Sequence, residues 1–119
     1  TPRLITAGRG LVNEECEAVV RYLQGLVRAA TWASQHSTQT RDFIARECSV
    51  EASKVDRFLG IDYPRRFMPA LTEELLGTVE ILKSFLLRHG YLHHDFAVAD
   101  WIDPQPLRAA LLREQETIT

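Results

Sequence analysis

Residues 13–33 read NEECEAVVRYLQGLVRAATWA, and this stretch decides the class of fold. Asn13 is a good N-cap for a helix, and the glutamates after it are stabilised by the positive end of the helix dipole. Apolar side chains then recur at helical spacing: Cys16, Val19, Val20, Leu23, Leu26, Val27 and Ala30. The stretch therefore predicts a long amphipathic helix, with small residues on one flank that let a second helix approach closely.

The residues before this helix predict one short strand. Residues 4–7 (LITA) form an apolar run, and Gly8-Arg9-Gly10 follows as a turn. A lone strand must pair with another strand to satisfy its backbone groups, and the sequence contains no second convincing one. We therefore expect the partners of this strand to lie outside these residues.

The residues after the long helix predict four more helices and two irregular connectors. The expected N-caps are Ser37, Ser49, Thr72 and Asp103, the last followed by Pro104 at the first helical position. Gly60 and Gly90 stand where the third and fourth helices of the chain should end. Residues 61–71 contain two prolines and no clean periodicity, and residues 91–102 are expected to be extended or loosely turned.

The composition is that of one globular piece, residues 1–119, without an internal domain boundary. Hydrophobic residues make up 45% of the chain and charged residues 25%, so disorder is not expected. The formal net charge is -2 and the basic residues form no tract, so we expect no nucleic-acid partner. No apolar run approaches the roughly 18 residues of a membrane-spanning helix. No motif points to a cofactor, and we expect none.

The residues that could carry metal or thiol chemistry have simpler interpretations. Metal-binding side chains gather near the end of the fourth helix: His89, His93, His94 and Asp95. Gly90 should stop the helix between His89 and His93, so we expect a solvated turn there and no metal site. Cys16 lies near a helix start, where a thiolate can be stabilised. Its neighbours and those of Cys48 are apolar, so we expect both cysteines to be packed free thiols.

Arg9 is the candidate residue for ligand binding. It follows the predicted strand, and ligands in open α/β sheets gather at the carboxyl ends of strands. The glycines around it are a weak phosphate-loop signal, because the glutamates of the next helix would repel an anion. Arg65-Arg66 is expected to be a solvated pair or a contact with another part of the protein. Trp32 and Trp101 are expected to fill gaps between helices, and we assign no catalytic residue.

The order of these segments closely resembles the carboxy-terminal third of solute-binding proteins that serve ABC importers for nitrate, alkanesulfonates, taurine or pyrimidine-precursor-like compounds. The resemblance covers residues 4–112. Its most specific parts are VRAATWA at residues 27–33 and ADWIDP at residues 99–104. The start of the long helix lacks the proline often found there in this family, which bears on the substrate subgroup more than on the fold.

This resemblance implies a mostly α-helical chain with one short strand, forming the carboxy-terminal part of a larger protein. That protein would have the two-lobed α/β fold called periplasmic-binding-protein-like type II. It would bind a small anion such as a sulfonate, taurine or nitrate between its lobes and deliver it to an ABC permease without chemistry. The implied partners are the missing amino-terminal lobe, the permease and the anionic ligand, and the implied location is the periplasm.

An enzyme is the alternative, because an aromatic sulfinate desulfinase and some thiamine-precursor synthases share this architecture. Residues 60–71 (GIDYPRRFMPAL) and 85–92 look as much like the desulfinase as like a transport protein. Such an enzyme would be cytoplasmic, and the resemblance places its reactive cysteine in the earlier lobe, so no residue of this chain inherits a catalytic role. A third alternative is an independent helical interaction module.

Self-association of the isolated chain is also expected. An unpaired strand presents free amides and carbonyls, and helices that would cover a missing lobe present apolar surface. The chain should then pair with itself by strand exchange or by helix packing.

Overall fold

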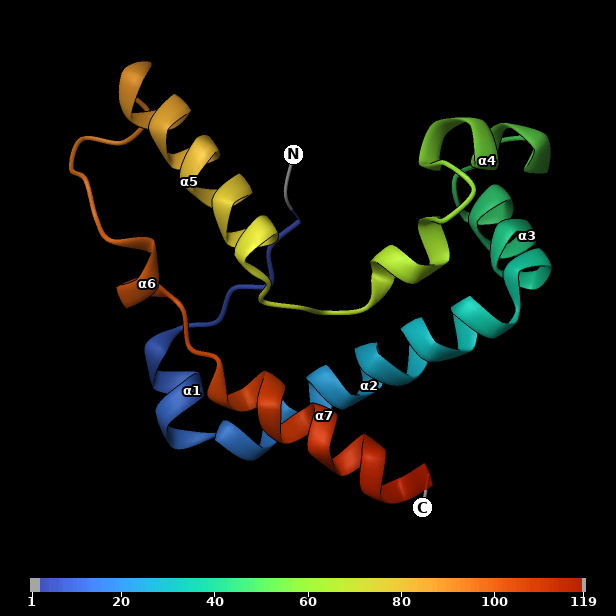
Figure 1. The fold of residues 1–119 in the computed structure, drawn as a ribbon, viewed down its shortest axis with the longest axis horizontal. Coiled ribbons are helices and arrows are strands. Elements are labelled where there is room, and N and C mark those ends of the chain that lie inside the picture. Colours follow the sequence, from blue (N-terminus) through green and yellow to red (C-terminus); the bar gives the residue numbers. More distant parts are fainter. Residues whose placement is uncertain (1–2, 119) are drawn as a thin grey trace.

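The structure is a computed structural model that describes residues 3–118, and these residues are mostly helical (Figure 1). The elements are α1 (Arg9–Glu14), α2 (Cys16–Gln35), α3 (Ser37–Glu47), α4 (Ala52–Leu59), the 3-10 helix η1 (Tyr63–Phe67), α5 (Glu73–Arg88), α6 (Val98–Trp101) and α7 (Gln105–Ile118). The prediction of a mostly α-helical chain is confirmed. Within the described range, no helix is both long enough and apolar enough to cross a lipid bilayer.

The longest helix, α2, forms the base of the fold, and α7 crosses it (Figure 1). Val20 and Leu23 of α2 form a buried core with Ala110 of α7. Ala110 is 0% exposed, and its small side chain lets the two helix backbones approach closely where they cross. The long helix predicted from the sequence is therefore present, and its apolar face is covered by the last helix of the chain.

A second packed unit consists of α3, α4 and η1. Its buried residues are Ala45 of α3, Val55 of α4 and Tyr63 of η1. Gly60 ends α4 as predicted, with a φ of 79° in the left-handed region that favours glycine. The connector then brings η1 against α2, so this unit is anchored to the base helix.

Helix α5 lies apart from α2 and packs on the segment that follows it (Figure 1). Thr72 caps α5 as predicted, because its Oγ1 accepts a backbone N–H of the first turn at 3.3 Å. Gly90, with a φ of 75°, ends the helix and turns the chain back. Lys83 holds the returning segment, because its Nζ lies 3.0 Å from the carboxylate of Asp95 and donates to the carbonyl of Phe96 at 2.8 Å.

These elements leave the molecule open instead of closing it into one globule (Figure 1). The radius of gyration is 16.8 Å, whereas a compact chain of this length is expected to have about 13.5 Å. The two buried clusters are separate, and many large apolar side chains are exposed. The most exposed include Tyr22, Phe58, Ile61, Ile81, Phe85, Tyr91 and Trp101. So much open apolar surface is typical of a protein that contacts a further partner.

The predicted strand is wrong. Residues 4–7 have no regular secondary structure, and no strand occurs among residues 3–118. The two-lobed α/β fold is therefore not seen in this chain. Leu4 and Ile5 are exposed, because a strand needs a hydrogen-bonded neighbour and the described residues provide none.

Several helix boundaries also differ from the predictions. In place of a turn, Gly8 caps α1 and Arg9 begins it, and Asn13 lies inside that helix, so α2 begins only at Cys16. Ser37 is the first residue of α3 and not its cap, while Ser49 lies in the turn before α4 with a φ of 55°. The two connectors are less irregular than expected, because η1 and α6 form within them.

Candidate functional site

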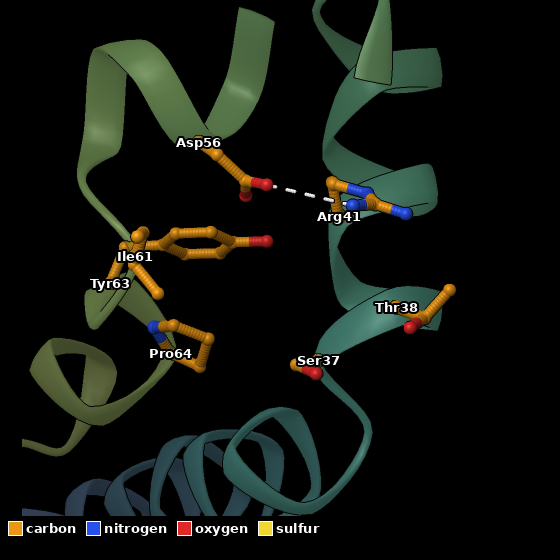
Figure 2. Close-up of a pocket in the computed structure, with 7 residues that line it drawn as sticks. All are labelled: Ser37, Thr38, Arg41, Asp56, Ile61, Tyr63 and Pro64. Atoms are coloured by element: carbon orange, nitrogen blue, oxygen red, sulfur yellow. Dashed lines mark ion pairs between the residues drawn. The ribbon is translucent and has the colours of Figure 1, made fainter. Parts of the chain in front are cut away.

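A pocket of about 160 Å³ lies between α3 and the connector that follows α4 (Figure 2). It is lined by Ser37, Thr38, Arg41, Asp56, Ile61, Tyr63 and Pro64. Helix α3 supplies two hydroxyls and a guanidinium to one wall, and Asp56 and the Tyr63 ring form the facing wall (Figure 2). The packing of α3 against α4 brings these groups together, because it sets Arg41 opposite Asp56.

Arg41 dominates the electrostatics of this pocket. Its Nη1 lies 3.5 Å from Oδ2 of Asp56, and its Nε lies 3.8 Å from Oδ1 of Asp42. The Nε atom is buried and has no hydrogen-bond partner among the described residues. Figure 2 shows the hydroxyl of Tyr63 directed into the space between Asp56 and Arg41. Arg41 therefore has one buried N–H without an acceptor beside the pocket, because Oδ1 of Asp42 is too far away for a hydrogen bond.

The Tyr63 ring is a buried part of the wall that faces α3. Only 3% of its surface is exposed, and its ring packs against that of Phe67 with 5.8 Å between centroids. Burial raises the pKa of the Tyr63 hydroxyl, the carboxylates of Asp56 and Asp42 raise it as well, and the guanidinium of Arg41 opposes them. The phenol therefore keeps its proton to higher pH, and its hydroxyl is available as a hydrogen-bond donor.

This pocket is small, and its one guanidinium is already paired with a carboxylate. The charged residues that line it, Arg41 and Asp56, have opposite charges, and Asp42 lies beside Arg41 outside the lining. The volume is also below the roughly 300–1,000 Å³ of ordinary small-molecule sites. An aromatic sulfinate is too large for about 160 Å³, and an anion of any size would have to compete with Asp56 for Arg41.

A shallower hollow of about 320 Å³ lies beside α6 and is lined by Phe96, Ala97, Asp100 and Trp101. The rings of Phe96 and Trp101 meet edge to face, with 6.0 Å between centroids. Nζ of Lys83 lies 5.5 Å from the centroid of the Phe96 ring. The hollow offers aromatic surface and one carboxylate, but no set of donors that would orient an anion.

The basic residues that the sequence singles out are distributed over separate elements. Arg9 lies exposed on α1, Arg65 and Arg66 lie exposed on η1, and residues 93–94 follow α5. None of them lines either of the two pockets described above. The binding role of Arg9 stays a prediction, although the strand that was expected to place it at a cleft is absent.

The predicted burial of the cysteines and tryptophans is wrong. Cys16 and Cys48 are exposed free thiols. Trp32 and Trp101 are half-exposed, and Trp32 stacks on His36 with 4.5 Å between ring centroids. The sequence pattern marks these residues as belonging to apolar faces, but no other described residues cover those faces here.

The histidine-rich turn after α5 is held against that helix by Asp95. Within residues 3–118, no group of three or more histidine, cysteine, aspartate or glutamate side chains is arranged to hold a metal ion. Asp95 pairs with Lys83, and this hydrogen bond lowers the pKa of the Asp95 carboxyl. Nζ of Lys83 also lies 2.9 Å from the carboxylate of Glu80, so the cation is shared between the helix and the turn.

Sequence reasoning did not find the pocket around Arg41, Asp56 and Tyr63. Single charged residues on short helices are typical of solvated faces, and a tyrosine before a proline is typical of a turn. The one available signal was the short link between the two predicted helices whose expected caps are Ser37 and Ser49. Such a link makes them neighbours, so charges of opposite sign on the two helices can meet.

The chain is similar to known enzymes along most of its length. It is 29% identical over 110 residues to the 2'-hydroxybiphenyl-2-sulfinate desulfinases of Rhodococcus erythropolis and Rhodococcus qingshengii. The match covers 92% of this chain and 30% of each relative, so the chain spans less than a third of the relatives' length. No family profile and no solved structure matches the chain. These findings give no support to the transporter interpretation, and they show a distant similarity to sulfinate desulfinases along almost the whole chain.

Proposed function

We propose that this chain is a structural part of an enzyme related to the sulfinate desulfinases. The observation that carries the proposal is the length of the match, which runs over 92% of the chain at 29% identity. A match of this extent includes the residues of both packed units and is not confined to one short motif. It therefore favours a common arrangement of helices in this chain and in the relatives.

The role that fits this chain is that of a scaffold for a catalytic centre formed elsewhere in the enzyme. Its exposed thiols lie apart in the chain, with Cys16 at the start of α2 and Cys48 in the turn after α3, and burial raises the pKa of the Tyr63 phenol, which is protonated at neutral pH in any case. Arg41 is paired with Asp56, so its guanidinium is not free to hold an anionic substrate. The open shape and the exposed apolar side chains suit a part that packs against other parts of a larger protein.

The complete enzyme would remove the sulfinate group from an aromatic sulfinate. In that reaction the carbon–sulfur bond breaks, the ring carbon takes up a proton, and the sulfur takes a hydroxide from water to leave as sulfite. The net change is a hydrolysis that needs no external oxidant or reductant, so the proposal includes no redox cofactor. An enzyme of this kind would work in the cytoplasm.

A solute-binding protein of an ABC importer is the second candidate function. It is motivated by the resemblance of the segment ADWIDP, residues 99–104, to that family; the segment forms most of α6 and leads into α7. In this case the parent protein would be periplasmic, would close two lobes over a small anion, and would meet a membrane permease.

The two candidates are separated by replacing the matching segment of the Rhodococcus erythropolis desulfinase with this chain. Release of sulfite by the hybrid protein supports the enzyme. A folded hybrid that binds the sulfinate and releases no sulfite favours the binding protein.

A further inference from the structure

Helix α5 has one covered face and one bare face. Lys83 marks the covered face, because its side chain is held between Glu80, Asp95 and the backbone of Phe96. Phe85 lies two positions further, which is about 200° around the helix and therefore on the opposite side. Phe85 is 51% exposed and Ile81, on the same side, is 72% exposed. In Figure 1 α5 stands clear of α2, α3 and α4, so this apolar face has no partner there.

The two ends of α5 carry opposite charges. Glu73 and Glu74 lie in its first turn, and Arg88 lies in its last turn. Glu74 and Arg88 are separated by about 21 Å along the helix axis, and each lies about 20° around the helix from Ile81, within the bare face. When two such helices pack antiparallel, the acidic end of each meets the basic end of the other. The two helix dipoles then point in opposite directions, which is also favourable.

The residues between the charged ends are complementary in size under the same antiparallel pairing. Ile81 lies midway between Glu74 and Arg88, so a two-fold axis at Ile81 places each Glu74 opposite the Arg88 of the second copy. The same axis places Phe85 opposite Gly77. A Cβ at Gly77 would meet nothing within 4 Å, so the surface there is open to receive an aromatic ring.

We propose that α5 is a self-association surface, and that two copies of this chain pair through it as an antiparallel helix dimer with the two-fold axis at Ile81. In this pairing the two copies place opposite charges together and a large side chain against a small one, and the two-fold axis relates all of these contacts. An isologous interface requires this self-complementarity. The occupant of the bare face is thus a second copy of this chain. This surface lies outside both pockets, and the inference assigns to a second copy one part of the exposed apolar surface that the proposed function otherwise assigns to the rest of the enzyme.

Sedimentation of the full chain over micromolar to millimolar concentrations tests the pairing. The chain should dimerise, Glu74→Lys should raise the dissociation constant about three- to tenfold, and Arg88→Glu should do the same. The double variant Glu74→Lys/Arg88→Glu should restore the dissociation constant to that of the unchanged chain. If the substitutions acted only through the stability of α5, the double variant would dimerise more weakly than either single variant, because it places both charges unfavourably for the helix dipole. A double variant that dimerises more weakly than either single variant would overturn the proposal.

Cysteine cross-linking tests the position of the axis. In a background of Cys16→Ser and Cys48→Ser, the variant Ile81→Cys should form a disulfide-linked dimer on mild oxidation, because the two copies of residue 81 face each other. Leu75→Cys, exposed on the same helix but about 120° around it from Ile81, is the matched control and should cross-link far less. Equal cross-linking of the two variants, or a chain that stays monomeric at every concentration, would show that α5 does not pair in this way.

Discussion

Arg113 donates two hydrogen bonds to Glu17, from Nη1 to Oε1 at 2.8 Å and from Nη2 to Oε2 at 2.9 Å. This forked pair connects the first turn of α2 to the middle of α7. A second pair, between Arg28 and Glu114 at 2.9 Å, lies further along the same two helices. The apolar core between α2 and α7 is thus bordered by two ion pairs, and the structure of the base depends on residues from distant parts of the sequence.

These pairs predict that the chain loses stability in acid. The hydrogen bonds from Arg113 and from Arg28 lower the pKa values of Glu17 and Glu114, respectively, below their usual 4.5. A carboxyl whose pKa is lower in the folded state stabilises the fold above its unfolded pKa, and that contribution disappears as the pH falls through the folded pKa. Thermal unfolding should therefore move to lower temperature below about pH 5.

The variant Glu17→Gln isolates the contribution of one pair. It should unfold at a slightly lower temperature than the unchanged chain at pH 7, because the forked pair is lost at a partly exposed site. The difference between the two proteins should shrink as the pH falls from 6 to 3. A difference that is constant across this range would mean that the Glu17 charge does not contribute.

The close crossing of α2 and α7 predicts sensitivity at Ala110. Replacing Ala110 by leucine should lower the free energy of unfolding by about 1–3 kcal/mol, because the buried site has no space for a longer side chain. Ala29→Leu, on the exposed side of α2, is the matched control and should change it by less than about 0.5 kcal/mol. Urea unfolding measures both, and equal effects would place the crossing elsewhere.

The burial of Tyr63 predicts that the stability of the fold also changes with pH at the alkaline end. Its pKa is raised by burial in the folded chain, so the neutral phenol stabilises the fold below the unfolded value near 10, and this contribution is lost as the pH rises. Tyr63→Phe removes the ionisation and keeps the ring. The unchanged chain should then lose stability more steeply above pH 10 than Tyr63→Phe. Parallel curves in urea titrations would contradict the burial of the hydroxyl.

The chain alone should not bind small sulfur or nitrogen oxyanions. The guanidinium of Arg41 is opposed by two aspartates, and exposed arginines such as Arg9 contribute little to binding in water. Calorimetric titration with taurine, an alkanesulfonate, nitrate and an aromatic sulfinate should show no binding tighter than millimolar. Micromolar binding that is lost on Arg9→Ala would mean that this chain contains the ligand site after all.

Features that depend on local chemistry could be predicted from the sequence. The cap at Thr72 and the stops at Gly60 and Gly90 follow from side-chain and backbone preferences of single residues. The start of the last helix was predicted one residue too early, because α7 begins at Gln105 and Pro104 precedes it, although Oδ1 of Asp103 does accept the N–H of Gln105 at 3.0 Å. Each of these features is decided within a few residues.

Features that depend on distant packing could not be predicted. Residues 4–7 have the composition of a strand but lack a neighbour, and Trp32 has an aromatic surface that nothing else in the described chain covers. The pocket around Tyr63 could not be predicted, because the burial of its polar ring depends on how α3 and α4 pack together. Periodicity shows which face is apolar, but it does not show what that face meets.

The most direct test of the desulfinase proposal is the hybrid enzyme in which this chain replaces the 110-residue matching segment of the Rhodococcus erythropolis desulfinase. Sulfite released from 2'-hydroxybiphenyl-2-sulfinate would be measured for the hybrid, and cooperative thermal unfolding would establish that it is folded. Our account predicts sulfite release that falls when Ala110→Leu disrupts the scaffold, and that persists when the exposed Ala29 is replaced by leucine. A hybrid that unfolds cooperatively, binds the sulfinate and releases no sulfite would contradict the account.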